Sequence, residues 1–185
     1  MRAVTYQGIK KVHVKEVEDP KIKKRDDIIV RITTTAIGGS DLHLFHGMIP
    51  NLKQGYIIGH EPMGIVEEVG PDVKKIKKGD RVIIPFNISC GECHYCKHEL
   101  TSLCDNFNPH GYPGGQAELM RVPYGNFTPF KISEGCEMED ESLVLLSDVL
   151  PTAYWSVDNA GVKKDDVVII LGCGPVGLMT QKFAW

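Results

Sequence analysis

The sequence predicts a mainly β domain with short helices, followed by the start of an α/β domain. Up to about residue 122 it holds short β-branched segments separated by glycine and proline, a pattern typical of a β-barrel or β-sandwich. Residues 167–171 are five apolar residues in a row, which indicates a strand buried on both faces, as in a parallel sheet. With 185 residues, one sizeable core fits but two full domains do not.

Glycine and proline bound the expected strands, because they interrupt the regular pairing of a sheet. Gly8 divides the first β-branched stretch into two short strands, and Pro20 closes this pair. Gly38 and Gly39 end a later strand, after which Ser40 is expected to cap a short helix. The expected strands cover residues 5–17, 28–37, 64–69, 81–84 and 116–122, and the short helix covers 41–45.

The remaining segments are expected to be loops and helices. The basic run at 21–25 is typical of a solvated loop. Residues 90–115 lack periodicity and are rich in Cys, Gly, Asn and Pro, so their order must come from something other than an apolar core. The spacing of apolar residues predicts helices at 139–149 and 153–160, the second with Gly161 as its C-cap.

Charge and composition exclude several classes of function. Lys and Arg number 21 against 24 Asp and Glu, and this net charge of −3 makes nucleic acid a poor partner. No stretch of about 18 apolar residues is present, so a membrane span is not expected. The first residues lack the apolar segment of a secretory signal, which favours a cytoplasmic protein with reduced cysteines.

Four cysteines lie within a short segment and have the spacing of metal ligands. Cys90, Cys93, Cys96 and Cys104 form C-x2-C-x2-C-x7-C, which fits a tetrahedral zinc site. A closed shell of four thiolates leaves no open position, so this zinc is expected to be structural. Its binding energy would stabilise a loop that has no core of its own.

Three other roles fit the four cysteines less well than structural zinc. An iron–sulfur cluster fits less well, because the last gap is long and Asp105 follows it rather than proline. Disulfides need an oxidising compartment, and a nucleic-acid-binding zinc ribbon needs basic neighbours where this loop is mainly acidic. Cys136 and Cys173 stand apart and are expected to be small buried apolar residues.

Four motifs follow one another along the chain. They are Gly-His-Glu at residues 59–61, the four-cysteine segment at 90–104, Gly-Gly-Gln-Ala-Glu at 114–118 and Gly-x-Gly-x-x-Gly at 172–177. With these motifs, in this order, the whole chain resembles the zinc-dependent medium-chain alcohol dehydrogenases. Residues 36–43 and 146–152 look like the branch of that family that includes the formaldehyde dehydrogenases.

The resemblance implies two domains. A GroES-like catalytic domain over residues 1–150 carries the structural zinc lobe at 90–104, and residues 151–185 form the start of a Rossmann NAD-binding domain. The glycine motif follows an expected strand and opens a helix, where such a turn cradles a dinucleotide phosphate, although a plain strand–helix connection has the same form. Its cofactor-binding residues are Gly172, Gly174 and Gly177.

The resemblance also implies a catalytic zinc site. His60 and Asp148 match two zinc ligands of the family. Glu61, directly after His60, is expected to be a catalytic residue that can move inward toward the metal. Ser40 and His43 match a relay that carries the alcohol proton outward. The implied reaction oxidises a small alcohol or aldehyde, as in the formaldehyde dehydrogenases, by hydride transfer from a zinc-bound alkoxide to NAD.

Position 38 departs from the family, whose first zinc ligand is a cysteine directly before Gly-Ser-Asp. Here that position is Gly38, which has no side chain to bind a metal. We therefore expect the catalytic zinc to bind far more weakly than in the family, or not at all, and the chain to be inactive as an enzyme. The alternative function is a non-catalytic, zinc-binding GroES-like interaction module.

Two further departures concern the cofactor and the substrate. The sequence ends at Trp185, eight residues after Gly177, whereas the acidic residue that contacts the cofactor ribose is expected about 20 residues beyond the motif. We therefore expect weak or absent NAD binding, and a homo-oligomer formed through the unpaired apolar strand. The segment between Cys104 and Gly114 is shorter than in many relatives of the formaldehyde branch, which leaves the substrate open.

Overall fold

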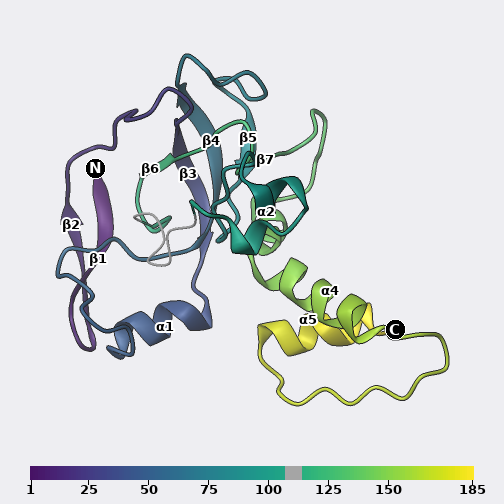
Figure 1. Ribbon diagram of the computed structural model, residues 1–185. Coiled ribbons are helices and arrows are strands. Elements are labelled where there is room, and N and C mark those ends of the chain that lie inside the picture. Colours follow the sequence, from purple (N-terminus) through teal and green to yellow (C-terminus); the bar gives the residue numbers. More distant parts are fainter. Residues whose placement is uncertain (107–113) are drawn as a thin grey trace.

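A five-stranded antiparallel sheet forms the centre of the molecule (Figure 1). The computed structural model describes residues 1–106 and 114–185, so most of the segment between Cys104 and Gly114 lies outside the described residues. The strand order is β6-β3-β4-β5-β7. The strands are β3 (Ile28–Ala36), β4 (Glu61–Val69), β5 (Arg81–Ile83), β6 (Leu119–Val122) and β7 (Phe130–Lys131).

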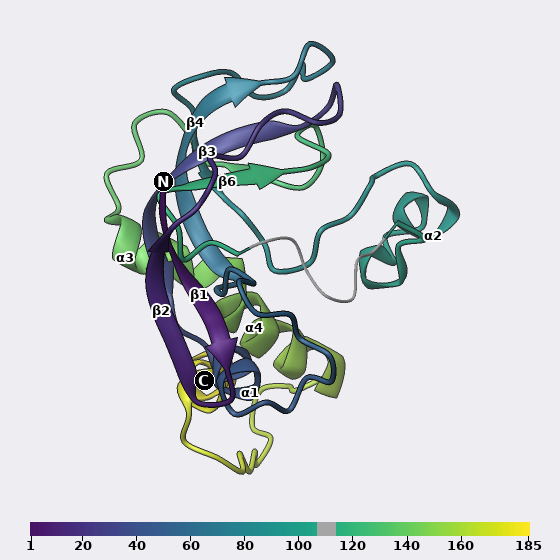
Figure 2. The same cartoon turned by 90° about the vertical axis from the view of Figure 1, so that its left-hand side faces the viewer.

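A separate antiparallel hairpin, β1 (Arg2–Gly8) and β2 (Lys11–Glu16), lies beside this sheet (Figure 2). Isolated bridges from Ala3 to Ala117 and from Thr5 to Ile57 connect β1 to the rest of the domain. Every residue of β2 is exposed, so the hairpin packs against the rest of the domain through β1. The expected pair of strands around Gly8 is confirmed.

The main core lies between the strands of the large sheet and the loops that cover it. Its buried residues are mostly β-branched, as strands that pack on one another favour. They are Ile28, Val30, Val66, Ile76, Val82, Ile84, Ile88, Met120 and Val122. A smaller cluster of Met63, Ile83, Leu143 and Val144 joins the sheet to the helices that follow it.

The helices are short, which confirms the expected mainly β class. They are α1 (Gly39–Phe45), α2 (His94–Lys97), α3 (Asp140–Leu143), α4 (Val149–Ala160) and α5 (Pro175–Phe183), with 3₁₀ turns η1 (Thr101–Leu103) and η2 (Val144–Ser147). Gly161 ends α4 in the left-handed conformation, φ 64°, as expected of its C-cap.

Two local expectations about helices are wrong. The residue before α1 is Gly38 rather than Ser40, and the Asp41 side chain accepts a hydrogen bond from the Gly38 backbone at 3.0 Å. The helix expected over 139–149 is split into α3 and η2. The Ser147 hydroxyl donates to the Val144 carbonyl at 2.6 Å, a local bond that competes with regular helix, and Asp148 leaves the helical conformation at φ −151°.

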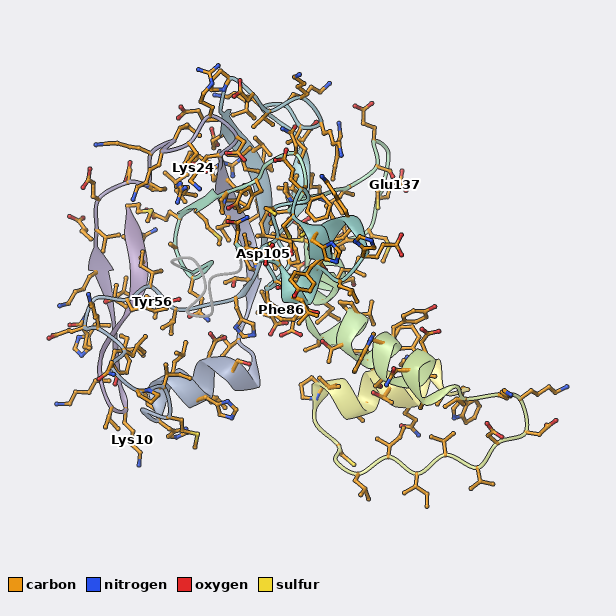
Figure 3. All side chains as sticks on the ribbon, viewed as in Figure 1. Lys10, Lys24, Tyr56, Phe86, Asp105 and Glu137 are labelled. Carbon is orange, nitrogen blue, oxygen red and sulfur yellow. The ribbon has the colours of Figure 1, made fainter. Side chains whose placement is uncertain are left out.

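The strand expected at 167–171 does not form. Val167, Ile169 and Leu171 are 93%, 81% and 94% exposed, and side chains project from both sides of this extended segment in Figure 3. A strand needs a partner for its backbone groups, and none lies beside this segment in the part of the chain that the structure describes. Cys173, expected to be buried, is exposed for the same reason, whereas Cys136 packs against the smaller core cluster.

A buried ion pair ties the edge strand β6 to the turn before β3. Asp27 is fully buried, and its carboxylate accepts hydrogen bonds from Arg121 at 2.6 and 3.0 Å. The backbone N–H groups of Lys23 and Lys24 donate to the same carboxylate. Burial opposes the ionisation of Asp27, but these donors outweigh it and hold the pKa of the carboxyl below its usual value of 3.8.

We expect Asp27→Asn to lower the free energy of unfolding at neutral pH by about 3–5 kcal/mol, because it removes the buried negative charge that the Arg121 guanidinium and two backbone N–H groups face. Since the folded-state pKa is depressed, the ion pair stabilises the chain above about pH 4, and this stabilisation is lost as the pH falls through the folded-state value. Urea unfolding at several pH values measures both effects. Asp158→Asn, at an exposed position, is the matched control, and equal midpoints for the two variants would contradict the expectation.

Candidate functional site

The register of β3 on β4 brings together two segments that are distant in sequence. Ala36, the last residue of β3, pairs with Glu61, the first residue of β4. The residues that follow β3 therefore lie beside those that precede β4. Gly38 and the start of α1 thus come next to Gly59 and His60.

The buried carboxylate of Asp41 orients this junction. One oxygen accepts a hydrogen bond from the Gly59 backbone at 3.1 Å and lies 3.2 Å from His60 Nδ1. The other accepts from the Gly38 backbone at 3.0 Å. With Nδ1 engaged by a carboxylate, His60 presents Nε2 to the opposite side, as metal-binding histidines do. Sequence reasoning gave Asp41 no role, although its place between Ser40 and His43 is the signal that could have found it.

His60, Glu61 and Asp148 form a cluster with the dimensions of a metal site. Their donor atoms all lie within 4.8 Å of one another. His60 Nε2 is 3.4 Å from Glu61 Oε1 and 3.3 Å from Asp148 Oδ2. A tetrahedron with metal bonds of about 2.0–2.1 Å has edges of about 3.3 Å, so both distances fit zinc coordination.

The electrostatics of this cluster favour a cation. Burial opposes protonation of His60, but its interactions with Asp148 and Asp41 and the charge of Glu61 outweigh it and raise the pKa to about 10. Burial raises the pKa of Glu61, and the interaction with His60 lowers that of Asp148. Without a metal, a protonated imidazole thus neutralises part of the negative charge that a divalent ion would otherwise balance.

Ser40 and His43, the expected proton relay, lie on α1 with exposed side chains. In the described part of the chain, neither is hydrogen-bonded to His60, Glu61 or Asp148. The structure therefore places both on α1, whose start lies beside His60, and their relay role stays a prediction.

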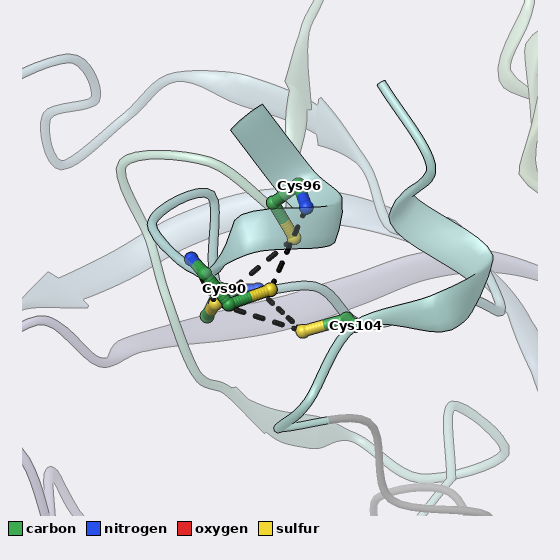
Figure 4. Close-up of side chains that lie close together, drawn as sticks. Cys90, Cys96 and Cys104 are labelled. Atoms are coloured by element: carbon green, nitrogen blue, oxygen red, sulfur yellow. Dashed lines mark hydrogen bonds between the residues drawn. The ribbon is translucent and has the colours of Figure 1, made fainter. Parts of the chain in front are cut away.

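The four cysteines converge as their spacing predicts, and Figure 4 shows three of their sulfurs facing one another. Cys90 Sγ lies 4.0 Å from Cys96 Sγ and 3.6 Å from Cys104 Sγ. Zinc–sulfur bonds of about 2.3 Å give a tetrahedron with edges of about 3.8 Å, which these distances bracket. They are far too long for disulfide bonds, and all four thiols are free.

Backbone N–H groups point at the sulfurs and stabilise negative charge there. Cys90 Sγ receives the N–H groups of Glu92 and Cys93 at 3.5 and 3.4 Å. Burial opposes ionisation of Cys90, yet these hydrogen bonds outweigh it and lower its pKa to about 6, whereas burial raises that of Cys96 to about 12. The cluster fits the structural zinc site of the zinc alcohol dehydrogenases.

A cavity of about 720 Å³ extends from Glu61 to the glycine turn. Gly38, Gly39 and Glu61 line one part of it, and the three glycines of the turn, Gly172, Gly174 and Gly177, line another. Gly172 has φ 111°, which favours glycine, and a Cβ on Gly177 would overlap the Gly172 carbonyl oxygen. Gly177 therefore lets the start of α5 approach the preceding backbone closely, whereas Gly172 and Gly174 face open space.

Comparisons with known proteins agree with this geometry. The family model of the alcohol dehydrogenase GroES-like domain matches residues 24–132. The chain is 63% identical over its whole length to an uncharacterised zinc-type alcohol dehydrogenase-like protein, AdhB, of Bacillus subtilis (strain 168), and covers 53% of it. Over 96% of its length it is 38% identical to a glutathione-independent formaldehyde dehydrogenase of Pseudomonas aeruginosa, covering 49% of that protein.

The solved structure of alcohol dehydrogenase TADH from Thermus sp. ATN1 matches with a TM-score of 0.93 and 37% identity, over 100% of this chain and 54% of that one. The chain therefore belongs to the zinc-type medium-chain alcohol dehydrogenase family and has its GroES-like domain. It spans about half the length of the curated relatives it matches. Among the described residues, no helix is long and apolar enough to cross a membrane.

We expect Cys96→Ser and Cys104→Ser each to lose the zinc of the cysteine cluster, because three thiolates and a hydroxyl bind it far more weakly. Native mass spectrometry should show one zinc fewer in each variant, and limited proteolysis should cut the loop around α2 faster. Cys136→Ser, outside the cluster, should keep both properties. An unchanged zinc content in the first two variants would show that the cluster does not hold this metal.

Proposed function

We propose that this chain contributes the metal- and substrate-binding part of an NAD-linked zinc-type alcohol or aldehyde dehydrogenase, with residues 1–150 as its catalytic domain and 151–185 as the start of its cofactor domain. The observation that supports this most directly is the position of Glu61 and Gly38 in the same cavity as the glycine turn. Substrate oxygen and nicotinamide can approach one another only where such a space adjoins both sites.

The residues fit both expected cofactors. Zinc, when bound, polarises the substrate oxygen, and NAD accepts the hydride. His60 and Asp148 would hold the metal, with Asp41 keeping Nε2 of His60 free for it. Gly172, Gly174 and Gly177 would let the cofactor phosphates approach the backbone at the start of α5. Ser40 and His43 would pass the alcohol proton to solvent, which their exposure allows.

Glycine at position 38 weakens this chemistry in our proposal. A thiolate that would hold the metal against the substrate oxygen is missing there. Glu61 contributes a carboxylate of the same charge, but it binds zinc less tightly than a thiolate does.

The competing function is a non-catalytic zinc-binding module. It would keep the cysteine cluster, whose free thiols suit the reducing cytoplasm that we propose as its compartment.

A cysteine at position 38 should restore oxidation. We expect Gly38→Cys, in the protein that contains these residues, to oxidise short alcohols or S-hydroxymethyl thiols at least about tenfold faster than the unchanged protein. NADH absorbance measures the rate. The matched control is Gly39→Cys, which places the same thiol one residue away and should not raise the rate.

The two other outcomes are equally decisive. Equal turnover by the unchanged protein and Gly38→Cys would show that glycine does not impair the site. No turnover by either, with zinc retained in the cysteine cluster, would reject the dehydrogenase proposal in favour of the interaction module.

We further propose that this chain forms a homo-oligomer that buries the apolar segment at 167–171. Val167, Ile169 and Leu171 are almost fully exposed, and water-exposed apolar side chains in a row favour association. We expect Ile169→Lys to reduce the sedimentation coefficient of the protein, because it places a charge within the contact. Asp165→Asn, at a nearby exposed position, also makes the charge more positive by one and should leave it unchanged. A monomer at every concentration would refute the proposed assembly.

A further inference from the structure

The carboxylate of Glu61 occupies the space that a side chain at position 38 would take. A Cβ on Gly38 would overlap Glu61 Oε1 and lie 2.8 Å from Cε1 and 3.0 Å from Nε2 of His60. Gly39, the next residue, has open space where its own Cβ would lie. The carboxylate of Glu61 thus occupies the place in which a residue-38 side chain would face His60.

Glu61 is also an unusual buried carboxylate. Its side chain is 2% exposed, and among the described residues Oε2 has no hydrogen-bond donor. Burying a carboxylate oxygen without a donor is costly, so such a group normally has a cation beside it. Its Oε1 lies 3.4 Å from His60 Nε2, within the three-residue cluster.

We propose that Glu61 takes the ligand position left open by glycine at residue 38, so that His60, Glu61 and Asp148 bind a divalent cation through nitrogen and oxygen alone. The inference rests on the metal site of the proposed function, but it concerns which atoms hold the ion and which ions the site accepts.

The donor set predicts a changed metal preference. A thiolate favours soft ions such as Cd²⁺, whereas carboxylates favour harder ions such as Mn²⁺. The unchanged chain, which offers the Glu61 oxygen, should therefore have a smaller ratio of Cd²⁺ affinity to Mn²⁺ affinity than Gly38→Cys, which offers sulfur. Zn²⁺ and Co²⁺ accept both donor types, so they should bind this site in either form.

The test uses Co²⁺ titrated into protein whose cysteine cluster already holds zinc, with the cobalt absorption bands as the signal. We expect Gly38→Ala to weaken Co²⁺ binding at least about tenfold, because its methyl group displaces the Glu61 carboxylate without supplying a donor. The matched control, Gly39→Ala, adds the same methyl group into open space and should leave the affinity unchanged.

A double-mutant cycle tests whether Glu61 binds the metal directly or only lies near it. Glu61→Gln should weaken Co²⁺ binding at least about tenfold in the unchanged chain, but alter it within about twofold in Gly38→Cys, where sulfur replaces the carboxylate. Glu137→Gln, at an exposed position, controls for the loss of one charge. An unchanged far-ultraviolet circular dichroism spectrum shows that each variant keeps the β-sheet fold.

Two results would overturn the inference. One is a Co²⁺ affinity that Gly38→Ala does not lower, and the other is an equal effect of Glu61→Gln in both backgrounds. None of these readouts uses turnover. Glu61-dependent metal binding without oxidation of any alcohol would therefore reject the proposed function while leaving the inference intact.

Discussion

The hydrogen bonds of the buried Asp41 carboxylate determine the geometry of the candidate site. They join the backbone of Gly38, at the start of α1, to the backbone of Gly59 and the ring of His60. The antiparallel register of β3 and β4 brings these segments together, and Asp41 then sets the direction of the imidazole. Without that carboxylate, His60 could turn Nε2 away from Glu61 and Asp148. The three donor atoms would then no longer face one another.

The two metal-type clusters depend on different parts of the fold. The cysteine cluster lies within one short segment and is built from local turns whose N–H groups point at sulfur. The His60 cluster takes Asp148 from the irregular residue between η2 and α4, so it forms only when the helical region packs against the sheet. Loss of zinc from the loop should therefore leave the second cluster in place, since no ligand is shared.

Local signals in the sequence predicted most of the strands and the cysteine cluster, because glycine, proline and cysteine spacing act within a few residues. The site of His60 and Asp148 is non-local, and only the family resemblance joined its parts. The place of the Glu61 carboxylate beside Gly38 depends on a strand register and a rotamer, which no spacing encodes. The strand at 167–171 was predicted wrongly because apolar composition reports burial, whereas a strand also needs a neighbouring strand.

X-ray absorption spectroscopy tests the central claim most directly. The sample is the protein with zinc in the cysteine cluster and Co²⁺ as the second metal, measured at the cobalt edge. The account predicts nitrogen and oxygen neighbours alone, at about 2.0–2.1 Å, and a sulfur neighbour at about 2.3 Å only in Gly38→Cys. Sulfur around cobalt in the unchanged chain, or an oxygen shell that Glu61→Gln leaves unaltered, would contradict it.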